Sequence, residues 1–253
     1  MIIDKMDTNS FNIRGYSECM DISDTNPIKQ LLATYGELQD KIIKGGELQG
    51  NVDISFDSKV WFKNIHCISQ HMRELACDKN ILKCVKKVLG PNVLLWGSSI
   101  NLKKPMESHR WHIDVEHLEW PGVSVFVGMQ GTSDQSTLDV LVGSHKFNNK
   151  NISFKTNFTN NDILNLASSI TTNPKIEKLP IKDNGFSLFS GELWHGSLNE
   201  TNNNRYAVIL QYTTPNNKIK IPVTWDKPIL WAKYDPINIL VSGKDLFNVN
   251  TYL

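Results

Sequence analysis

The chain of 253 residues has few cysteines, almost no net charge and no long apolar segment. Its four cysteines show no C-x-x-C spacing, so we expect buried free thiols in a reducing compartment rather than a disulfide framework. The net charge of +1 gives no electrostatic reason to expect nucleic acid or an anionic membrane as a partner. The first residues lack the basic segment and apolar run of a signal peptide, and no apolar window is long enough to span a bilayer. We therefore expect a cytoplasmic protein.

Linkers, internal repeats and low-complexity tracts are also missing, which favours one domain over residues 1–253. Residues 1–91 are expected to be mainly helical and to support the rest of the chain. Apolar residues recur there at helical spacing in three stretches: 28–42, 61–76 and 81–89. Asp78 is the expected N-cap of the third helix, and Gly90 is expected to end it.

From residue 92 onward the pattern changes to short β-rich runs bounded by Gly, Pro, Asn and Ser. The runs are NVLLWGSSINL, SHRWHIDVEH, GVSVFVGMQ, TLDVLVGSH, GFSLFSGELWHGS and RYAVILQYT. A polar insertion near residues 146–182 separates the fourth run from the fifth, and insertions of this kind are often lids or binding loops. Helices followed by many short strands predict an α+β fold with a sandwich or open barrel at residues 92–215 and a C-terminal extension at 216–253.

The stretch WHIDVEH brings histidines and acids close together. In a regular strand, His112, Asp114 and Glu116 share one face. An H-x-D pair alone is a weak signal, because a solvated strand of mixed charge carries the same letters. His195 adds weight, since it ends an apolar, aromatic run where a surface histidine has little reason to lie. Two histidines and one carboxylate from separate strands are the ligands of the facial triad that binds non-heme Fe(II).

Arg205 follows His195 by ten residues (205 − 195) and begins the next β-rich run. An arginine on a neighbouring strand can hold the far carboxylate of a 2-oxoacid through a charge-assisted fork, although it could also be an ordinary strand-end cation. His66 and His71 are five residues apart, which is not the spacing of a helical metal pair. We expect both at the surface or partly buried.

Four pieces of the chain occur in the order found in a known family: WHID, VGSHK, GFSLFSGELWHGS and NNNRYAVILQY, with SINLKK upstream. Over roughly residues 95–215, about half its length, the chain resembles the phytanoyl-CoA dioxygenase (PhyH-like) family of Fe(II)/2-oxoglutarate-dependent oxygenases. The resemblance implies a double-stranded β-helix of the jelly-roll, cupin-like type, with the N-terminal helices packed on the outside. Val142 departs from the family, which commonly has proline there, and this bears only on the local turn.

The resemblance implies three iron ligands: His112, Asp114 and His195. It also implies that Arg205 binds the C5 carboxylate of the cosubstrate 2-oxoglutarate, with contacts from Ser197 and Asn101. Ser197 could instead only shape the turn with Gly196. His145, in VGSHK, is expected to be a structural turn residue. An acid at position 114, where halogenating relatives have a small residue, favours hydroxylation.

Glu116 and Trp120 are the candidate substrate contacts, although Glu116 could be solvated and Trp120 could belong to the core. The expected protein is an Fe(II)/2-oxoglutarate-dependent dioxygenase that uses O2. It would hydroxylate a C–H bond of a small polar metabolite, amino- or sugar-containing, and release succinate and CO2. A non-catalytic metal-binding member of the fold and a metal-dependent hydrolase remain alternatives, the latter needing further ligands or a general base. No feature of the sequence indicates an oligomeric state.

Overall fold

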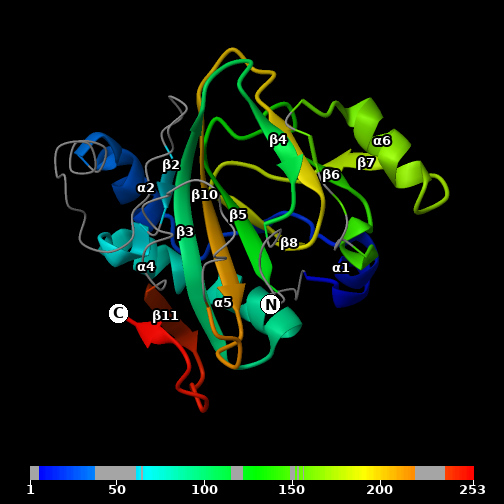
Figure 1. Cartoon of the computed structure of the whole chain (residues 1–253). Helices are drawn as coiled ribbons and strands as arrows, with labels where there is room; N and C mark the ends of the chain where they lie inside the picture. Colours follow the sequence, from blue (N-terminus) through cyan, green and yellow to red (C-terminus); the bar gives the residue numbers. More distant parts are fainter. Residues whose placement is uncertain are drawn as a thin grey trace.

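The computed structural model describes the chain at residues 6–37, 61–63, 65–114, 122–148, 152, 154–155, 157–219 and 237–253. Two antiparallel sheets face each other across the interior of the molecule, one large and one small (Figure 1). This is the predicted α+β fold with a double-stranded β-helix at its centre. The predicted substrate contacts Glu116 and Trp120 lie outside the described residues.

The large sheet has the strand order β1-β8-β5-β10-β3-β11-β12, with β2 also paired to β3. Its strands are β1 (Met20–Asp21), β2 (Trp61–Lys63), β3 (Val93–Lys103), β5 (Val123–Gln130), β8 (Gly185–Ser190), β10 (Arg205–Thr213), β11 (Ile237–Ser242) and β12 (Thr251–Tyr252). The small sheet has the order β4-β9-β6-β7. Its strands are β4 (Ser108–His112), β6 (Leu138–Leu141), β7 (Ile176–Lys178) and β9 (His195–Leu198).

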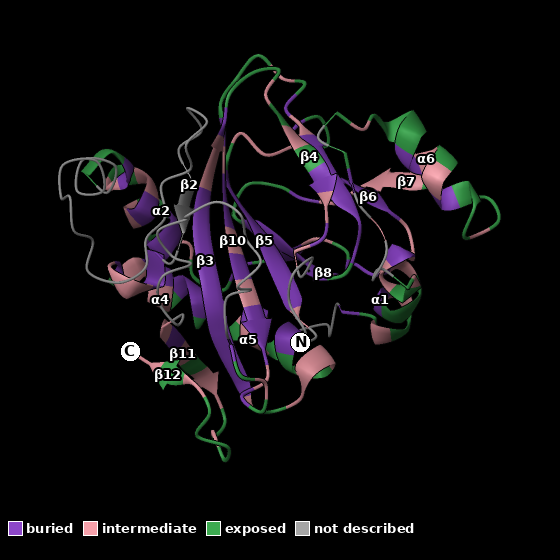
Figure 2. Cartoon of the chain, in the orientation of Figure 1, coloured by how far each residue is buried: buried purple, intermediate pink, exposed green. Residues whose placement is uncertain are grey.

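The N-terminal helices cover the outer face of the large sheet, as predicted. α2 (Asn26–Ala33), α4 (Gln70–Ala76) and α5 (Lys79–Leu89) bury their apolar faces against its strands in one core cluster, and the strands beneath them are buried along most of their length (Figure 2). Each fully buried Leu, Ile or Val in that cluster stabilises the fold by roughly 1.5–3 kcal/mol relative to an exposed one. Asp78 is the N-cap of α5, since its carboxylate accepts from the backbone N–H of Asn80 and Ile81 at 2.9 and 3.1 Å.

The described residues of the 146–182 insertion pack against the outer face of the small sheet. α6 (Asn160–Ser168) buries Ile163 and Ala167 in a cluster with Trp111 and Trp194, and β7 adds an edge strand to the sheet. Side chains alternate between the two faces of a strand, so the Trp111 face is opposite the face that carries His112. These residues therefore support the sheet from outside.

The structure corrects the predictions for residues 61–76. Trp61–Lys63 form β2, paired with β3, and not the first turn of a helix, while α4 begins at Gln70 after a short 3-10 turn, η1 (Ile65–Cys67). A short apolar run has no periodicity that separates strand from helix, which is why this boundary was wrong. His66 is fully buried and not near the surface, because its ring bridges Ser98 on β3 and the backbone carbonyl of Ile237 on β11, both at 2.8 Å.

Two further elements lie at the ends of the small sheet: α1 (Thr8–Arg14) and the 3-10 turn η2 (Ser144–Lys146). His145 lies in η2, and its Nε2 is 3.2 Å from the carbonyl oxygen of Asn12, so it joins a turn to α1, in keeping with the structural role expected. All four cysteines are free thiols, as predicted, but the prediction that they are buried holds only for Cys84, since Cys19 and Cys67 are half-buried and Cys77 is exposed. Among the described helices, none has both the length and the apolar character needed to cross a bilayer.

Candidate metal centre

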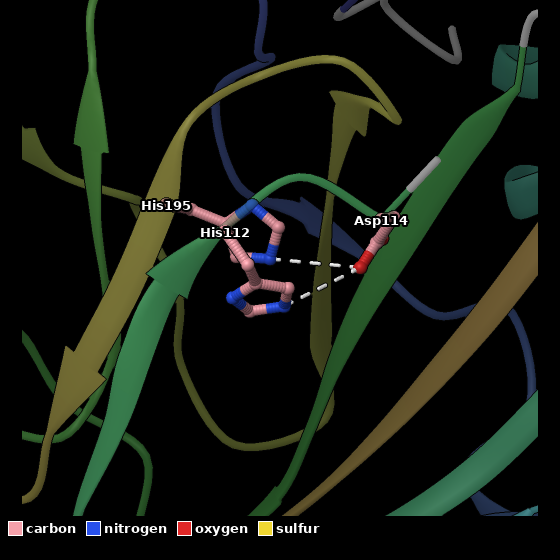
Figure 3. A group of neighbouring side chains, drawn as sticks. All are labelled: His112, Asp114 and His195. Atoms are coloured by element: carbon pink, nitrogen blue, oxygen red, sulfur yellow. Dashed lines mark ion pairs between the residues drawn. The ribbon is translucent and has the colours of Figure 1, made fainter. Parts of the chain in front are cut away.

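His112, Asp114 and His195 converge in the interior between the two sheets (Figure 3). His112 is the last residue of β4 and His195 is the first residue of β9, and the two are direct partners in the ladder. Paired residues of an antiparallel ladder share a face, so both rings point the same way. Asp114 lies beyond the end of β4, so the strand alternation that led us to group it with His112 does not extend to it. It reaches the histidines from the segment that leaves the strand.

The three side chains are spaced as ligands of one metal ion. Oδ1 of Asp114 is 3.7 Å from Nε2 of His112 and 3.6 Å from Nε2 of His195. The candidate ligand atoms all lie within 4.8 Å of one another. A divalent transition metal held at about 2.1 Å by ligands at right angles separates their donor atoms by about 3.0 Å. Shifts of a fraction of an ångström at each side chain therefore close this set around a metal, and the donors fit the group.

The hydrogen bonds of the two histidines leave their Nε2 atoms as donors to a metal. Nδ1 of His112 is 2.9 Å from the carbonyl oxygen of Arg110, and Nδ1 of His195 is 2.9 Å from that of Leu193. A carbonyl oxygen only accepts, so each Nδ1 carries the proton and each Nε2 lone pair points into the centre. Burial, with a contribution from nearby His195, lowers the pKa of His112 to about 3. The His112 imidazole is thus neutral at pH 7, the form that ligates metals.

Asp114 is held in place from the large sheet. The hydroxyl of Ser124, on β5, donates to Oδ2 of Asp114, which leaves Oδ1 facing the histidines. Phe189, the neighbour of Ser124 on β8, packs its ring against His195, with centroids 4.9 Å apart. The one sequence signal that could have found Ser124 is a polar residue within the apolar run VSVFV. In the structure Ser124 is buried.

A second group of polar residues lies along the same face of the large sheet. Arg205 and Lys103 are direct partners on β10 and β3 and are 2% and 7% exposed. The Arg205 guanidinium carbon is 5.2 Å from the centre of the Phe126 ring, and within the described part of the chain its buried Nε has no hydrogen-bond partner. Burial lowers the pKa of Arg205 to about 10, against an opposing effect of Glu107.

Ser197 and Asn101 complete this basic end of the site. The ammonium group of Lys103 donates to the hydroxyl of Ser197, which lies two residues after His195 on β9. Asn101 is two residues before Lys103 on β3, and its Oδ1 is buried without a hydrogen-bond partner among the described residues. The structure thus brings Arg205, Ser197 and Asn101 to one face of the site, and it adds Lys103. The sequence offered two adjacent lysines in SINLKK, and only burial separates Lys103 from the exposed Lys104.

Comparison with known proteins identifies the fold. No protein-family model and no curated protein matches the chain, but solved structures do. EctD from S. alaskensis with bound Fe has a TM-score of 0.69 at 22% identity, covering 93% of this chain and 85% of that chain. A non-heme monooxygenase, the ThoJ–Ni complex, has a TM-score of 0.66 at 16% identity, covering 97% and 86%. The epimerase SnoN, in complex with Fe3+, alpha ketoglutarate and nogalamycin RO, has a TM-score of 0.63 at 14% identity, covering 94% of each chain.

Because the sequence identities are low, these likenesses show a shared fold and nothing beyond it. The shared fold is the jelly roll described above, and the solved structures that share it include ones with bound Fe and ones with 2-oxoglutarate. In this chain the fold carries a His–Asp–His cluster between its two sheets.

Proposed function

We propose that this protein is an Fe(II)- and 2-oxoglutarate-dependent dioxygenase, similar to the phytanoyl-CoA dioxygenase family. It uses O2 to hydroxylate a C–H bond of a small polar metabolite, amino- or sugar-containing, and it releases succinate and CO2. The observation that carries the proposal is the pairing of two features in one interior: a three-ligand metal centre and the buried guanidinium of Arg205, whose Nε lacks a partner.

A buried guanidinium of this kind calls for an anionic ligand. Taking a charge out of water is costly unless a counter-charge and hydrogen bonds replace the lost hydration. Arg205 lies on β10 and Lys103 opposite it on β3, with the Ser197 hydroxyl held by Lys103. A carboxylate placed between these groups would pair with two cations and accept hydrogen bonds from them, which are the interactions that the C5 carboxylate of 2-oxoglutarate requires.

The protein's residues have separate tasks around the metal. His112, His195 and Asp114 would hold Fe(II), which supplies the activation of O2 coupled to decarboxylation of the 2-oxoacid. Three protein ligands leave three positions of an octahedral ion for cosubstrate and oxygen. Ser124 keeps the Asp114 carboxylate turned towards the histidines, the Phe189 ring packs against His195, and the Phe126 ring lies against the Arg205 guanidinium.

Two other functions have less support. A metal-dependent hydrolase needs a general base or further ligands, and it has no task for Arg205 or Lys103. A non-catalytic metal-binding member of the fold would bind the metal and 2-oxoglutarate without turnover. The solved neighbours include an epimerase as well as a monooxygenase. The acid at Asp114 favours hydroxylation over halogenation.

Anaerobic reconstitution with Fe(II) and 2-oxoglutarate tests the proposal. We expect the weak visible charge-transfer band of a 2-oxoacid bound to Fe(II), and succinate release when air and a suitable metabolite are admitted. His112→Ala, Asp114→Ala and His195→Ala should each lose both the band and decarboxylation. His71→Ala, on α4 and outside the centre, is the matched control and should keep both. Full activity in any of the three ligand variants would overturn the assignment of the triad.

A further inference from the structure

One side chain on the interior face of the large sheet has no task in the site described so far. Gln211 lies on β10 between Leu210 and Tyr212. Both neighbours are buried in the core cluster under the helices, and the Tyr212 hydroxyl donates to the carbonyl oxygen of Ala76 in α4 at 2.9 Å. Side chains alternate along a strand, so Gln211 points to the opposite face, which looks onto the metal centre.

The ladder places Gln211 in the row of residues that borders the metal centre. Its direct partner on β5 is Ser124, which bonds Asp114, and the partner of Ser124 on β8 is Phe189, which packs against His195. Directly opposed residues of an antiparallel pair have Cα atoms about 4.5–5.5 Å apart. Gln211 is therefore one strand away from the residue that orients a metal ligand.

The partner of Gln211 on its other side is a glycine, and the side chain uses the space this leaves. Gly97 lies in the middle of β3, where glycine weakens a strand and often marks a close approach. A Cβ at Gly97 would lie 2.6 Å from Oε1 of Gln211, so only glycine lets the amide lie in this place. The register of β3 and β10 shifts between Gln211 and Tyr212, where Trp96 is the extra residue on β3, and bulges commonly re-aim side chains beside active sites.

Gln211 lies level with the metal centre and far along β10 from the proposed cosubstrate site. It is six residues (211 − 205) after Arg205 on β10, which is roughly 20 Å along the strand on the same face. The Arg205 guanidinium reaches Phe126, which pairs with Ile209, while Asp114 is anchored at the level of Gln211. A 2-oxoacid held by Arg205 therefore approaches the metal along β10 from the Arg205 end, and Gln211 lies beside the metal centre.

We propose that Gln211 is a substrate-positioning residue that binds a neutral polar group of the substrate, a hydroxyl or an amide, beside the metal; this inference rests on the proposed function. Within the described residues, no hydrogen bond involves its side-chain amide, which offers both a donor and an acceptor and carries no charge. A hydroxyl or amide matches both groups. A carboxylate or an ammonium ion would be partly desolvated there without a counter-charge, which is unfavourable.

Small probes that share one ring and differ in one polar group test this inference. The protein is loaded with Mn(II) and saturating 2-oxoglutarate, and the relaxation of probe protons by the paramagnetic ion reports binding beside the metal. The probes are cis-cyclohexane-1,2-diol and cyclohexanecarboxamide, with cyclohexanecarboxylate and cyclohexylamine as charged counterparts. We expect the diol and the carboxamide to relax at least fivefold more than the charged probes, and Gln211→Ala to remove that excess.

Two further variants separate a direct role from a general one. Gln211→Glu should transfer the preference to cyclohexylamine, because a carboxylate pairs with an ammonium ion. Gly97→Ala displaces the Gln211 amide without removing it, so it should reduce the excess relaxation of the neutral probes as Gln211→Ala does. The double variant should show no effect beyond that of Gln211→Ala alone. Gln130→Ala, an exposed glutamine at the far end of β5, is the matched control and should relax the probes as the wild type does.

Calorimetry of 2-oxoglutarate on the Mn(II)-loaded protein distinguishes this inference from the proposed function. If 2-oxoglutarate fails to bind the wild type, the proposed function fails and the role of Gln211 fails with it. If 2-oxoglutarate binds, two results overturn only the inference about Gln211. One is equal relaxation of the neutral probes in the wild type and in Gln211→Ala. The other is relaxation of the neutral probes in the wild type that is no greater than that of the charged probes.

Discussion

Replacing Arg205 by methionine should stabilise the ligand-free protein while removing most of its response to 2-oxoglutarate. Arg205 is 2% exposed, and its buried Nε has no hydrogen-bond partner in the described part of the chain. The buried charge of Arg205 therefore lowers the free energy of unfolding of the ligand-free protein. Methionine fills much of the same volume against the Phe126 ring without a charge.

The magnitude follows from the burial of the charge. Burial lowers the pKa of Arg205 from 12.5 to about 10, which corresponds to roughly 3 kcal/mol against the charged form. Replacing buried ionic groups by apolar residues of similar volume is often stabilising by about 1–4 kcal/mol. We expect a gain of roughly 2 kcal/mol for Arg205→Met, or about 4–8 °C in Tm for a domain of this size.

The response to 2-oxoglutarate should change in the opposite sense. A ligand at about one hundred times its Kd stabilises the folded state by about 2.7 kcal/mol. Loss of a charge-assisted pair commonly removes roughly 1.5–3 kcal/mol of binding energy, or about one to two orders of magnitude in affinity. At the same ligand concentration the stabilisation of Arg205→Met then falls to about 0.4–1.4 kcal/mol.

Thermal unfolding of the Ni(II)-loaded protein, with and without 2-oxoglutarate, measures both effects in one series. Lys104→Met is the matched control, because Lys104 is an exposed cation next to Lys103 and should change neither quantity. A folded Arg205→Met protein that melts below the wild type in the absence of ligand would refute the argument from burial. A wild-type response to 2-oxoglutarate would refute the assignment of Arg205 as the carboxylate anchor.

Two other substitutions test the surroundings of the site and of the fold. Ser124→Ala releases Oδ2 of Asp114, so Mn(II) affinity measured by calorimetry should fall about 10–100-fold, and unchanged affinity would contradict the orienting role. Burial lowers the pKa of His66 to about 4. Below pH 6.5 the unfolded chain therefore binds a proton at His66 that the folded chain does not bind, and the free energy of unfolding falls as the pH falls from 6.5 towards 4. Between pH 7 and 4.5 the wild type should lose about 2 kcal/mol more than His66→Gln in urea unfolding, and parallel pH profiles would count against this.

Local sequence patterns predicted the elements whose signals are complete within a few residues. α5 begins after its Asp78 cap and ends before Gly90, and β10 spans the run RYAVILQYT, as expected. His195 was expected at the end of the run GFSLFSGELWHGS, but the structure divides this run into β8 and β9 and makes His195 the first residue of β9, paired with His112. The β2 strand was not predicted, since three residues form a strand only through pairing with β3.

The residues that support the centre depend on contacts between distant segments. Ser124 and Asp114 are ten residues apart (124 − 114) and meet only because the chain crosses from the small sheet to the large one between them. Lys103 and Lys104 are equivalent as letters, yet one is buried beside Ser197 and the other is exposed. No pattern within a single strand distinguishes such neighbours, because burial is set by the strand paired opposite.

The run RYAVILQYT shows how far alternation alone can reach into function. Period-2 alternation groups Arg205, Ala207, Ile209 and Gln211 on one face, and this grouping could be read from the letters. Its meaning comes from the partner strands: Lys103 opposite Arg205, and Gly97 and Ser124 on either side of Gln211. Because one continuous strand carries both residues, their separation is fixed by backbone geometry and does not depend on a loop. The cosubstrate anchor and the proposed substrate contact are then held at a constant distance from each other, so both ligands can be positioned together at the metal centre.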